Sequence, residues 1–303
     1  MHEDRETRTA SVIALIATTA MWGLSFVSTK VLLRHMRPIE IAFLRHVVAA
    51  IATWAAVAFA RPSIRVSRRA LPNMLAAALI GIPIYYYFEN TALLYLSAAT
   101  ASIITASTPA MTAIIESVFR RKRIAVAGWA GILVSAAGVA MVVQSGAAQA
   151  ATRGAGSGEF LVGVGLLLVS ALAWSLYTIL NKANVASYGV LTTNAYQITS
   201  ATILLGLASL GRGASWQSAL ASREVLLNLG YLGIFCSAAG YSLYLFALRS
   251  LGPTLVSAFI NLVPVFGVAG SALILGERVT PLQAVGGITV ILGILAVERT
   301  QGG

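Results

Sequence analysis

Residues 11–33 read SVIALIATTAMWGLSFVSTKVLL, an apolar run in which Lys30 is the sole charged residue. An α-helix needs about 20 mostly apolar residues to cross the hydrocarbon core of a bilayer. A secretory signal has a shorter core behind a basic segment, whereas residues 1–9 mix acidic and basic side chains. We therefore expect this run to be a retained first membrane helix.

Nine further apolar runs follow, bounded by proline, glycine or arginine residues. Strands of a membrane β-barrel would show alternation over about ten residues each, and these runs lack it. The sequence therefore predicts an all-α membrane protein with ten transmembrane helices. The predicted spans are Ser11–Leu33, Ile39–Ala60, Leu71–Leu93, Ala98–Phe119, Val126–Ser145, Phe160–Lys182, Leu191–Leu210, Leu226–Leu248, Thr254–Leu275 and Leu282–Val297.

The composition agrees with a membrane protein. Hydrophobic residues make up 58% of the 303 residues and charged residues 10%, against about 25% charged residues in soluble domains. The net charge of +11 comes largely from short loops, which favours topology determination and contact with anionic lipid over nucleic-acid binding. Cys236 is the lone cysteine, so the sequence predicts no disulfide and no cysteine metal site, and we expect no cofactor.

Basic residues also predict the orientation. One cluster, Arg61, Arg65, Arg68 and Arg69, lies between spans 2 and 3, and a second, Arg120–Arg123, lies between spans 4 and 5. Loops rich in lysine and arginine remain in the cytoplasm. We therefore predict that both termini are cytoplasmic and that the protein lies in a bacterial cytoplasmic (inner) membrane.

The chain divides into two halves. Gly146–Gly158 is rich in Gly, Ala and Ser, which is typical of a flexible linker. It separates a predicted five-helix repeat over residues 1–145 from a second over residues 159–303.

The two halves resemble each other in sequence. A shift of 152 residues pairs Trp22 with Trp174, and a later shift of 155 residues pairs Tyr86 with Tyr241 and other positions as far as the spaced glycines of the last span. Two copies with an odd number of spans must be inverted relative to each other. Inverted repeats are common in secondary transporters, which bind substrate near the midplane at the repeat interface.

The order of these features resembles the EamA-type proteins of the drug/metabolite transporter superfamily. Each half opens with a mid-span tryptophan, in Trp22-Gly-Leu-Ser-Phe and Trp174-Ser-Leu-Tyr, and the second half carries Pro264 and then Gly276-Glu-Arg-Val-Thr. The resemblance covers nearly the whole chain and implies a ten-helix inverted-repeat exporter of amino acids or other metabolites. One departure is Lys122, which stands where the second half has Glu277.

Polar and aromatic residues inside the spans indicate where a substrate would bind, because such groups are costly against lipid. We expect them to line a central cavity, although helix packing and interfacial anchoring are an alternative for the aromatic residues. Pro109 and Pro264 interrupt spans 4 and 9 and are predicted hinges. The predicted substrate-binding residues are Trp22, Ser25, Tyr86, Asn90, Thr105, Trp174, Tyr177, Tyr241 and Tyr244.

Glu89 is the most informative charged residue within a span. An intramembrane carboxylate is a candidate for ion coupling or substrate binding, so Glu89 is the predicted coupling residue. A structural ion pair with Arg45 of span 2 is the alternative.

The predicted function is secondary transport of small metabolites, amino acids above all, out of the cytoplasm by alternating access. The sequence contains no phosphate loop and no H-E-x-x-H motif, and no cluster of residues for covalent chemistry, so we expect a transporter and not an enzyme. An importer or exchanger of another metabolite class and a lipid-modifying membrane enzyme are the alternatives. The expected partners are a small-molecule substrate and membrane lipid, and both a monomer and a homodimer fit the sequence.

Overall fold

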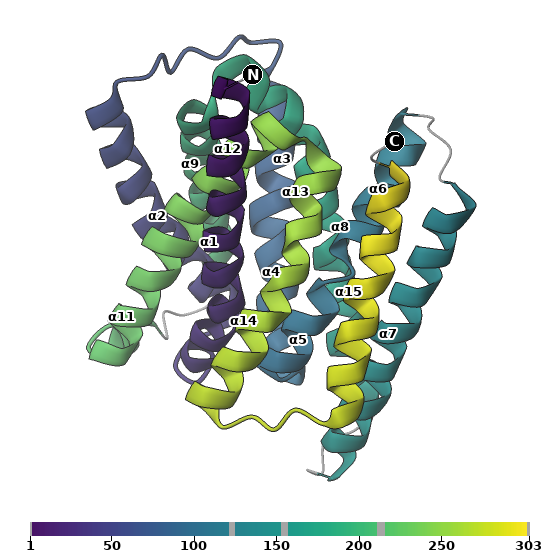
Figure 1. Ribbon diagram of the computed structural model, residues 1–303. Helices are drawn as coiled ribbons and strands as arrows, with labels where there is room; N and C mark the ends of the chain where they lie inside the picture. Colours follow the sequence, from purple (N-terminus) through teal and green to yellow (C-terminus); the bar gives the residue numbers. More distant parts are fainter. Residues whose placement is uncertain (1, 121–124, 153–156, 211–215, 302–303) are drawn as a thin grey trace.

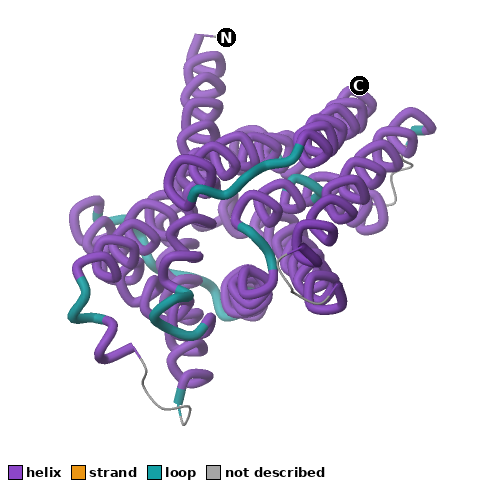
Figure 2. The backbone as a smooth tube through the Cα atoms, turned by 90° about the horizontal axis from the view of Figure 1, so that it is seen from below, coloured by secondary structure: helices purple, strands orange, loops and turns teal. Residues whose placement is uncertain are grey.

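The computed structural model describes residues 2–120, 125–152, 157–210 and 216–301, and every element within these ranges is a helix. Figures 1 and 2 show a bundle of long helices joined by short loops. The elements of the first half are α1 (His2–Leu32), α2 (Pro38–Ala60), α3 (Leu71–Leu79), the π-helical η1 (Ile80–Ile84), α4 (Tyr85–Tyr95), α5 (Ala98–Thr105), α6 (Thr108–Arg120) and α7 (Val126–Thr152).

The second half follows a similar order and has three additional short elements. Its elements are α8 (Ser157–Tyr188), α9 (Val190–Ser209), α10 (Trp216–Ala219), α11 (Arg223–Gly230), the π-helical η2 (Tyr231–Ala239), α12 (Gly240–Leu251), α13 (Pro253–Phe259), the 3-10 segment η3 (Ile260–Leu262), α14 (Val263–Gly270), the π-helical η4 (Ser271–Leu275) and α15 (Pro281–Gln301).

Eight helical stretches among the described residues are long and apolar enough to cross a bilayer. Each overlaps one of the predicted spans, which confirms an all-helical membrane protein. The stretches are Glu6–Leu32, Pro38–Ala60, Leu71–Tyr95, Ala98–Phe119, Val126–Gln149, Gly158–Tyr188, Arg223–Leu251 and Leu255–Leu275.

The other two predicted spans are helices with a weaker apolar signal. α9 buries Thr192, Asn194 and Gln197, which lower its mean hydropathy, and the apolar part of α15 is limited to Pro281–Gly293. Both helices nevertheless belong to the bundle, because α9 packs along α2 and α15 packs along α7. That the chain crosses the membrane ten times stays a prediction.

The halves pack through matched pairs of helices. α1 lies against α12 and α14, while α8, the corresponding helix of the second half, lies against α4 and α6. α2 packs on its counterpart α9, and α7 on its counterpart α15 at one edge of the bundle (Figure 1). The N-terminus, the C-terminal end and the loop between α2 and α3 lie at one end of the bundle, whereas the loop between η4 and α15 lies at the other (Figure 1).

Helix interruptions occur at equivalent points in the two halves. η1 contains Pro83, and η2 overlaps the positions 155 residues later without any proline. α5 ends at Thr105 and α6 begins at Thr108, and the corresponding break in the second half is η3. Pro109 and Pro264 each lie in the first turn after a break, where the missing N–H costs little.

The predicted linker is partly helical. α7 continues through Gly146 to Thr152, and α8 begins at Ser157. The expectation of a flexible segment is therefore wrong for residues 146–152 and 157–158, and residues 153–156 lie outside the described residues. The alanines and glutamine of this stretch favour a helix once α7 has formed.

Charged side chains satisfy the two helix ends that meet between α4 and α5. Lys30 Nζ donates to the carbonyls of Leu93 and Leu96, at 2.5 and 2.7 Å, where α4 ends. The Glu277 carboxylate accepts from the backbone N–H groups of Ala98 and Ala99, at 3.1 and 3.0 Å, where α5 begins. Cations favour helix C-termini and anions favour N-termini, so both contacts stabilise the bundle. Lys122, the counterpart of Glu277, lies outside the described residues.

The α7–α15 seam depends on glycines. A Cβ atom at Gly138 would lie 2.6 Å from the Gly286 carbonyl oxygen and 2.7 Å from the Val290 nitrogen. Because both atoms belong to the backbone of α15, they cannot move aside without separating the helices. The spaced glycines therefore allow close backbone approach, as in other small-residue helix seams.

We expect Gly138→Ala to destabilise the protein, because overpacking a tight contact costs about 1–3 kcal/mol. The thermal unfolding midpoint in detergent should fall by roughly 3 °C or more. Gly165→Ala is the matched control, since a Cβ at Gly165 meets no atom within 4 Å. Equal midpoints for the two variants would contradict the close seam.

Candidate substrate site

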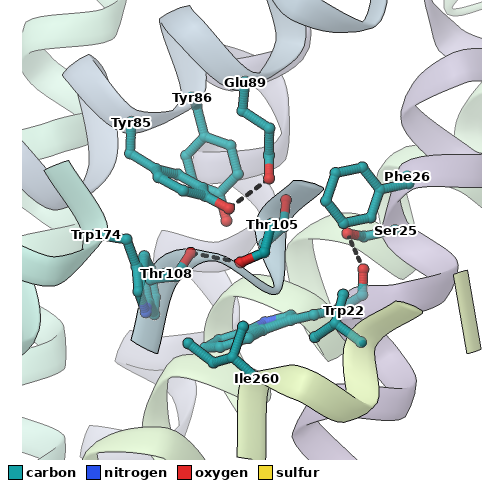
Figure 3. Close-up of a pocket in the computed structure, with 11 residues that line it drawn as sticks. Trp22, Ser25, Phe26, Tyr85, Tyr86, Glu89, Thr105, Thr108, Trp174 and Ile260 are labelled. Atoms are coloured by element: carbon teal, nitrogen blue, oxygen red, sulfur yellow. Dashed lines mark hydrogen bonds between the residues drawn. The ribbon is translucent and has the colours of Figure 1, made fainter. Parts of the chain in front are cut away.

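A cavity lies inside the bundle where α1, α4 and α8 meet the two helix breaks, and Figure 3 shows its walls. Its volume is about 30 Å³, which holds a water molecule or two. A metabolite is larger, so the surrounding helices must separate before one can enter. The lining residues come from both halves and are Trp22, Ser25, Phe26, Tyr85, Tyr86, Glu89, Thr105, Thr108, Trp174, Ile260 and Val263.

Aromatic rings form one side of this cavity. Trp22 and Trp174, at corresponding places in the repeat, meet edge to face with ring centroids 4.9 Å apart. Tyr85 lies 5.1 Å from Trp174 and 4.8 Å from Tyr86. Such edge-on and tilted pairs are favourable beyond the apolar area that they bury. The rings therefore form a connected surface on which a flat or apolar substrate group could pack.

Polar groups in the cavity come mainly from the first half. The Tyr85 hydroxyl donates to the Glu89 carboxylate one helical turn away, and Thr108 Oγ1 donates to the Thr105 carbonyl across the helix break at 2.6 Å (Figure 3). The residues 155 positions after these threonines are Ile260 and Val263. Three pairs of lining residues thus occupy corresponding positions, namely Trp22 with Trp174, Thr105 with Ile260 and Thr108 with Val263. The helix break is polar in the first half and apolar in the second.

Two hydrogen bonds between the halves anchor the aromatic residues to the π-helical segments. Trp22 Nε1 donates to the Cys236 carbonyl in η2 at 2.9 Å, and the Tyr241 hydroxyl donates to the Gly81 carbonyl in η1 at 3.1 Å. Gly81 and Cys236 are themselves 155 residues apart. Carbonyls at a π-helical segment are poorly satisfied within their own helix. A side chain of each half therefore donates a hydrogen bond to such a carbonyl in the other half.

The predicted site residues fall into two groups. Trp22, Ser25, Tyr86, Thr105 and Trp174 line the cavity, as does Glu89. Tyr177, Tyr241 and Tyr244 are buried against Trp174, with ring centroids 4.9 to 5.4 Å away. Asn90 lies apart from the lining, because its side chain donates to the Pro38 carbonyl at the start of α2.

Five lining residues were outside the predicted set, namely Phe26, Tyr85, Thr108, Ile260 and Val263. Ile260 and Val263 are apolar and carry no signal of their own. The repeat shift could have found them, since it maps the Thr105–Thr108 break onto their positions.

Arg45 and Glu89 do not form the ion pair that was the structural alternative for Glu89. The guanidinium of Arg45 instead lies over the Tyr86 ring, 4.2 Å from its centroid, and Arg45 Nε donates to Ser237 Oγ at 3.1 Å. Glu89 accepts from Tyr85. The carboxylate therefore faces the cavity while the guanidinium lies behind the Tyr86 ring.

Comparison with known proteins agrees with this architecture. The chain matches the model of the EamA-like transporter family over residues 9–144 and again over residues 161–299. An uncharacterized transporter from Archaeoglobus fulgidus is 27% identical over 95% of this chain and 99% of its own length. A probable amino-acid metabolite efflux pump from Escherichia coli is 26% identical over 95% and 94% of the two chains.

A probable terminal-alkyne amino-acid exporter from Streptantibioticus cattleyicolor is also 26% identical, over 95% of this chain and 93% of its own. One solved crystal structure has a TM-score of 0.67 to this chain at 17% identity, and the match covers 95% and 96% of the two chains, so the two share a fold. The family model matches both halves, which together make up most of the sequence. The protein is therefore an integral membrane protein that belongs to the EamA-like transporter family.

Proposed function

We propose that this protein exports amino acids or closely related small metabolites by alternating access, with the cavity between the halves as the substrate site. The observation that carries the proposal is the pairing of Trp22 and Trp174, equivalent residues of the two halves, in the wall of one cavity. Two relatives named as an amino-acid exporter and an amino-acid metabolite efflux pump support the substrate class.

The matched packing of the halves supports an inverted repeat of five spans each. If the halves are inverted, exchanging their conformations converts a cavity open to one side into a cavity open to the other. The paired breaks before Pro109 and Pro264 lie beside the cavity, and we infer that they are the hinges of this exchange. The small cavity volume fits a conformation closed on both sides.

The cavity chemistry favours substrates with a cationic group and an apolar or aromatic group. Glu89 can accept from an ammonium group, aromatic faces attract cations, and Ile260 and Val263 offer an apolar surface. An amino acid with a bulky side chain meets these requirements.

Transport in liposomes tests the function. Purified protein is reconstituted, and uptake of labelled amino acids is measured with and without a proton gradient, together with organic acids and sugars as other metabolite classes. We expect saturable uptake of bulky amino acids above that of empty liposomes. Uptake of sugars or organic acids alone would contradict the substrate class.

The orientation is tested with single cysteines in a variant lacking Cys236. We propose that the end of the bundle holding both termini and the loop with Arg61 is cytoplasmic. A cysteine at Ser157 should then react with an impermeant thiol reagent in intact cells, and a cysteine at Ser67 only after the membrane is opened. Labelling of the Ser67 position alone in intact cells would reverse the orientation.

A further inference from the structure

Arg45 is a buried cation that forms no close ion pair with the described residues. Its side chain is 1% exposed, and its Nη1 atom is buried with no hydrogen-bond partner. Its guanidinium contacts the Tyr86 ring and the Ser237 hydroxyl, which are neutral. The Glu89 carboxylate attracts it electrostatically without a direct contact. An unpaired charge inside a membrane protein is costly and marks a candidate functional group, as does a buried donor with no acceptor.

Among the described residues, no carboxylate contacts the Arg45 guanidinium directly. Glu89 is the carboxylate of α4 and lies about one turn beyond Tyr86. Its hydrogen bond, however, is with the Tyr85 hydroxyl. His46 lies beside the same ring, with centroids 5.0 Å apart. Its Nδ1 pairs with the Ala42 carbonyl at 2.7 Å, so in the neutral imidazole the proton is on Nδ1 and Nε2 can only accept.

Tyr86 separates this guanidinium from the cavity. One face of the Tyr86 side chain carries Arg45 at 4.2 Å, and the residue also belongs to the cavity lining (Figure 3). A rotation of the Tyr86 ring would connect Arg45 with the space that Glu89 and the tryptophans enclose. The connected site would then hold a cation from α2, Arg45, that can bind an anion and a carboxylate from α4, Glu89, that can bind an ammonium group.

We propose that Arg45 binds the carboxylate of the substrate, after the Tyr86 ring moves aside, while Glu89 binds its ammonium group. The guanidinium fork matches a carboxylate in two parallel hydrogen bonds, and the free Nη1 supplies one donor. The substrate is then a zwitterion with an apolar side chain against the aromatic wall. This inference rests on the proposed function and defines the substrate class of the same site.

The test compares three probes that differ in their charged groups, namely phenylalanine, phenethylamine and 3-phenylpropionate. Transport of each into liposomes, and quenching of tryptophan fluorescence by each in detergent, are measured for the wild type, Arg45→Gln and Arg45→Lys. Arg249→Gln is the control, since Arg249 is an exposed arginine at the end of α12. Size-exclusion chromatography checks that every variant is folded.

For the wild type we expect phenylalanine to be preferred over both analogues. In Arg45→Gln the preference for phenylalanine over phenethylamine should fall about 10-fold or more, since a charged hydrogen bond contributes about 1.5–3 kcal/mol. Arg45→Lys should restore part of the preference, because it keeps the charge without the fork. Arg249→Gln should retain the wild-type preference.

Three results would overturn the inference. An Arg45→Gln protein that is folded but keeps the wild-type preference would leave Arg45 with no role in recognising the carboxylate. A chloride dependence that disappears in Arg45→Gln, with the preference unchanged, would assign the site to a free anion. A wild type that neither binds nor carries any amino acid of the panel would refute the proposed function, and this inference with it.

Discussion

Replacing Glu89 by Gln is expected to abolish the response of transport to a proton gradient, while exchange of substrate across the membrane continues with weaker substrate binding. Glu89 lies in the cavity wall and is 5% exposed, so its carboxyl group can bind either a proton or the substrate's ammonium group. Glutamine has the same shape and can still accept from the Tyr85 hydroxyl, but it cannot bind and release a proton. The substitution therefore removes coupling with little change in packing.

The measurement is accumulation of labelled substrate in liposomes with an imposed pH difference. If one proton is exchanged per substrate, a difference of one pH unit sustains about 10-fold accumulation. Glu89→Gln should show none. Counterflow of labelled against unlabelled substrate should persist at higher substrate concentrations, because the amide oxygen still accepts a hydrogen bond from the ammonium group without the negative charge. Glu116→Gln, in α6 and outside the cavity lining, is the control and should respond as the wild type does.

A different result would assign Glu89 a structural role. In that case Glu89→Gln would lower the thermal midpoint and leave the gradient response intact. That outcome would refute Glu89 as the coupling residue without affecting the substrate cavity.

Truncating Trp174 to Ala is expected to reduce transport at least 10-fold. Trp174 is 4% exposed and contacts Trp22, Tyr85 and Tyr177 within 5.1 Å between ring centroids. Its removal opens the aromatic wall and takes away a ring that packs against both halves. The loss of stacking and burial for a substrate ring is about 1–3 kcal/mol, or roughly 10-fold to 100-fold in affinity.

Stability must be separated from binding in this experiment, because truncating a buried tryptophan can cost about 3–5 kcal/mol. Trp174→Phe keeps a ring in the wall and should lose less transport than Trp174→Ala. Trp129→Ala removes a tryptophan that is 49% exposed on α7 and should transport normally. If Trp174→Ala is folded in detergent and transports as the wild type does, Trp174 has no part in the substrate site.

Much of the candidate site could be predicted from the sequence because the repeat and the cost of polar groups in a membrane are local signals. Trp22, Tyr86 and Trp174 were predicted from matched positions, and they line the cavity. Asn90 was predicted because polar groups are costly inside a span, but its side chain binds the backbone of α2. A buried amide can be satisfied either by facing the cavity or by bonding to the backbone of a neighbouring helix. Spacing along one helix cannot distinguish these two arrangements.

The role of Glu277 shows the same limit. The sequence marks it as an acidic residue at the end of a span, with Lys122 in its place in the first half. Its carboxylate binds the first N–H groups of α5, about 180 residues earlier in the chain. Capping of a helix by a residue so distant in sequence depends on how the halves are assembled.

The sequence by itself determined that the chain is a helical membrane protein with two related halves, because hydropathy and repeat spacing are properties of consecutive residues. Only the tertiary structure decided which side chains meet across the halves. The Trp22–Trp174 contact and the position of Arg45 over Tyr86 depend on helix rotation and on interruptions such as η1. Helix packing sets these through contacts between residues far apart in the chain, and no local pattern encodes them.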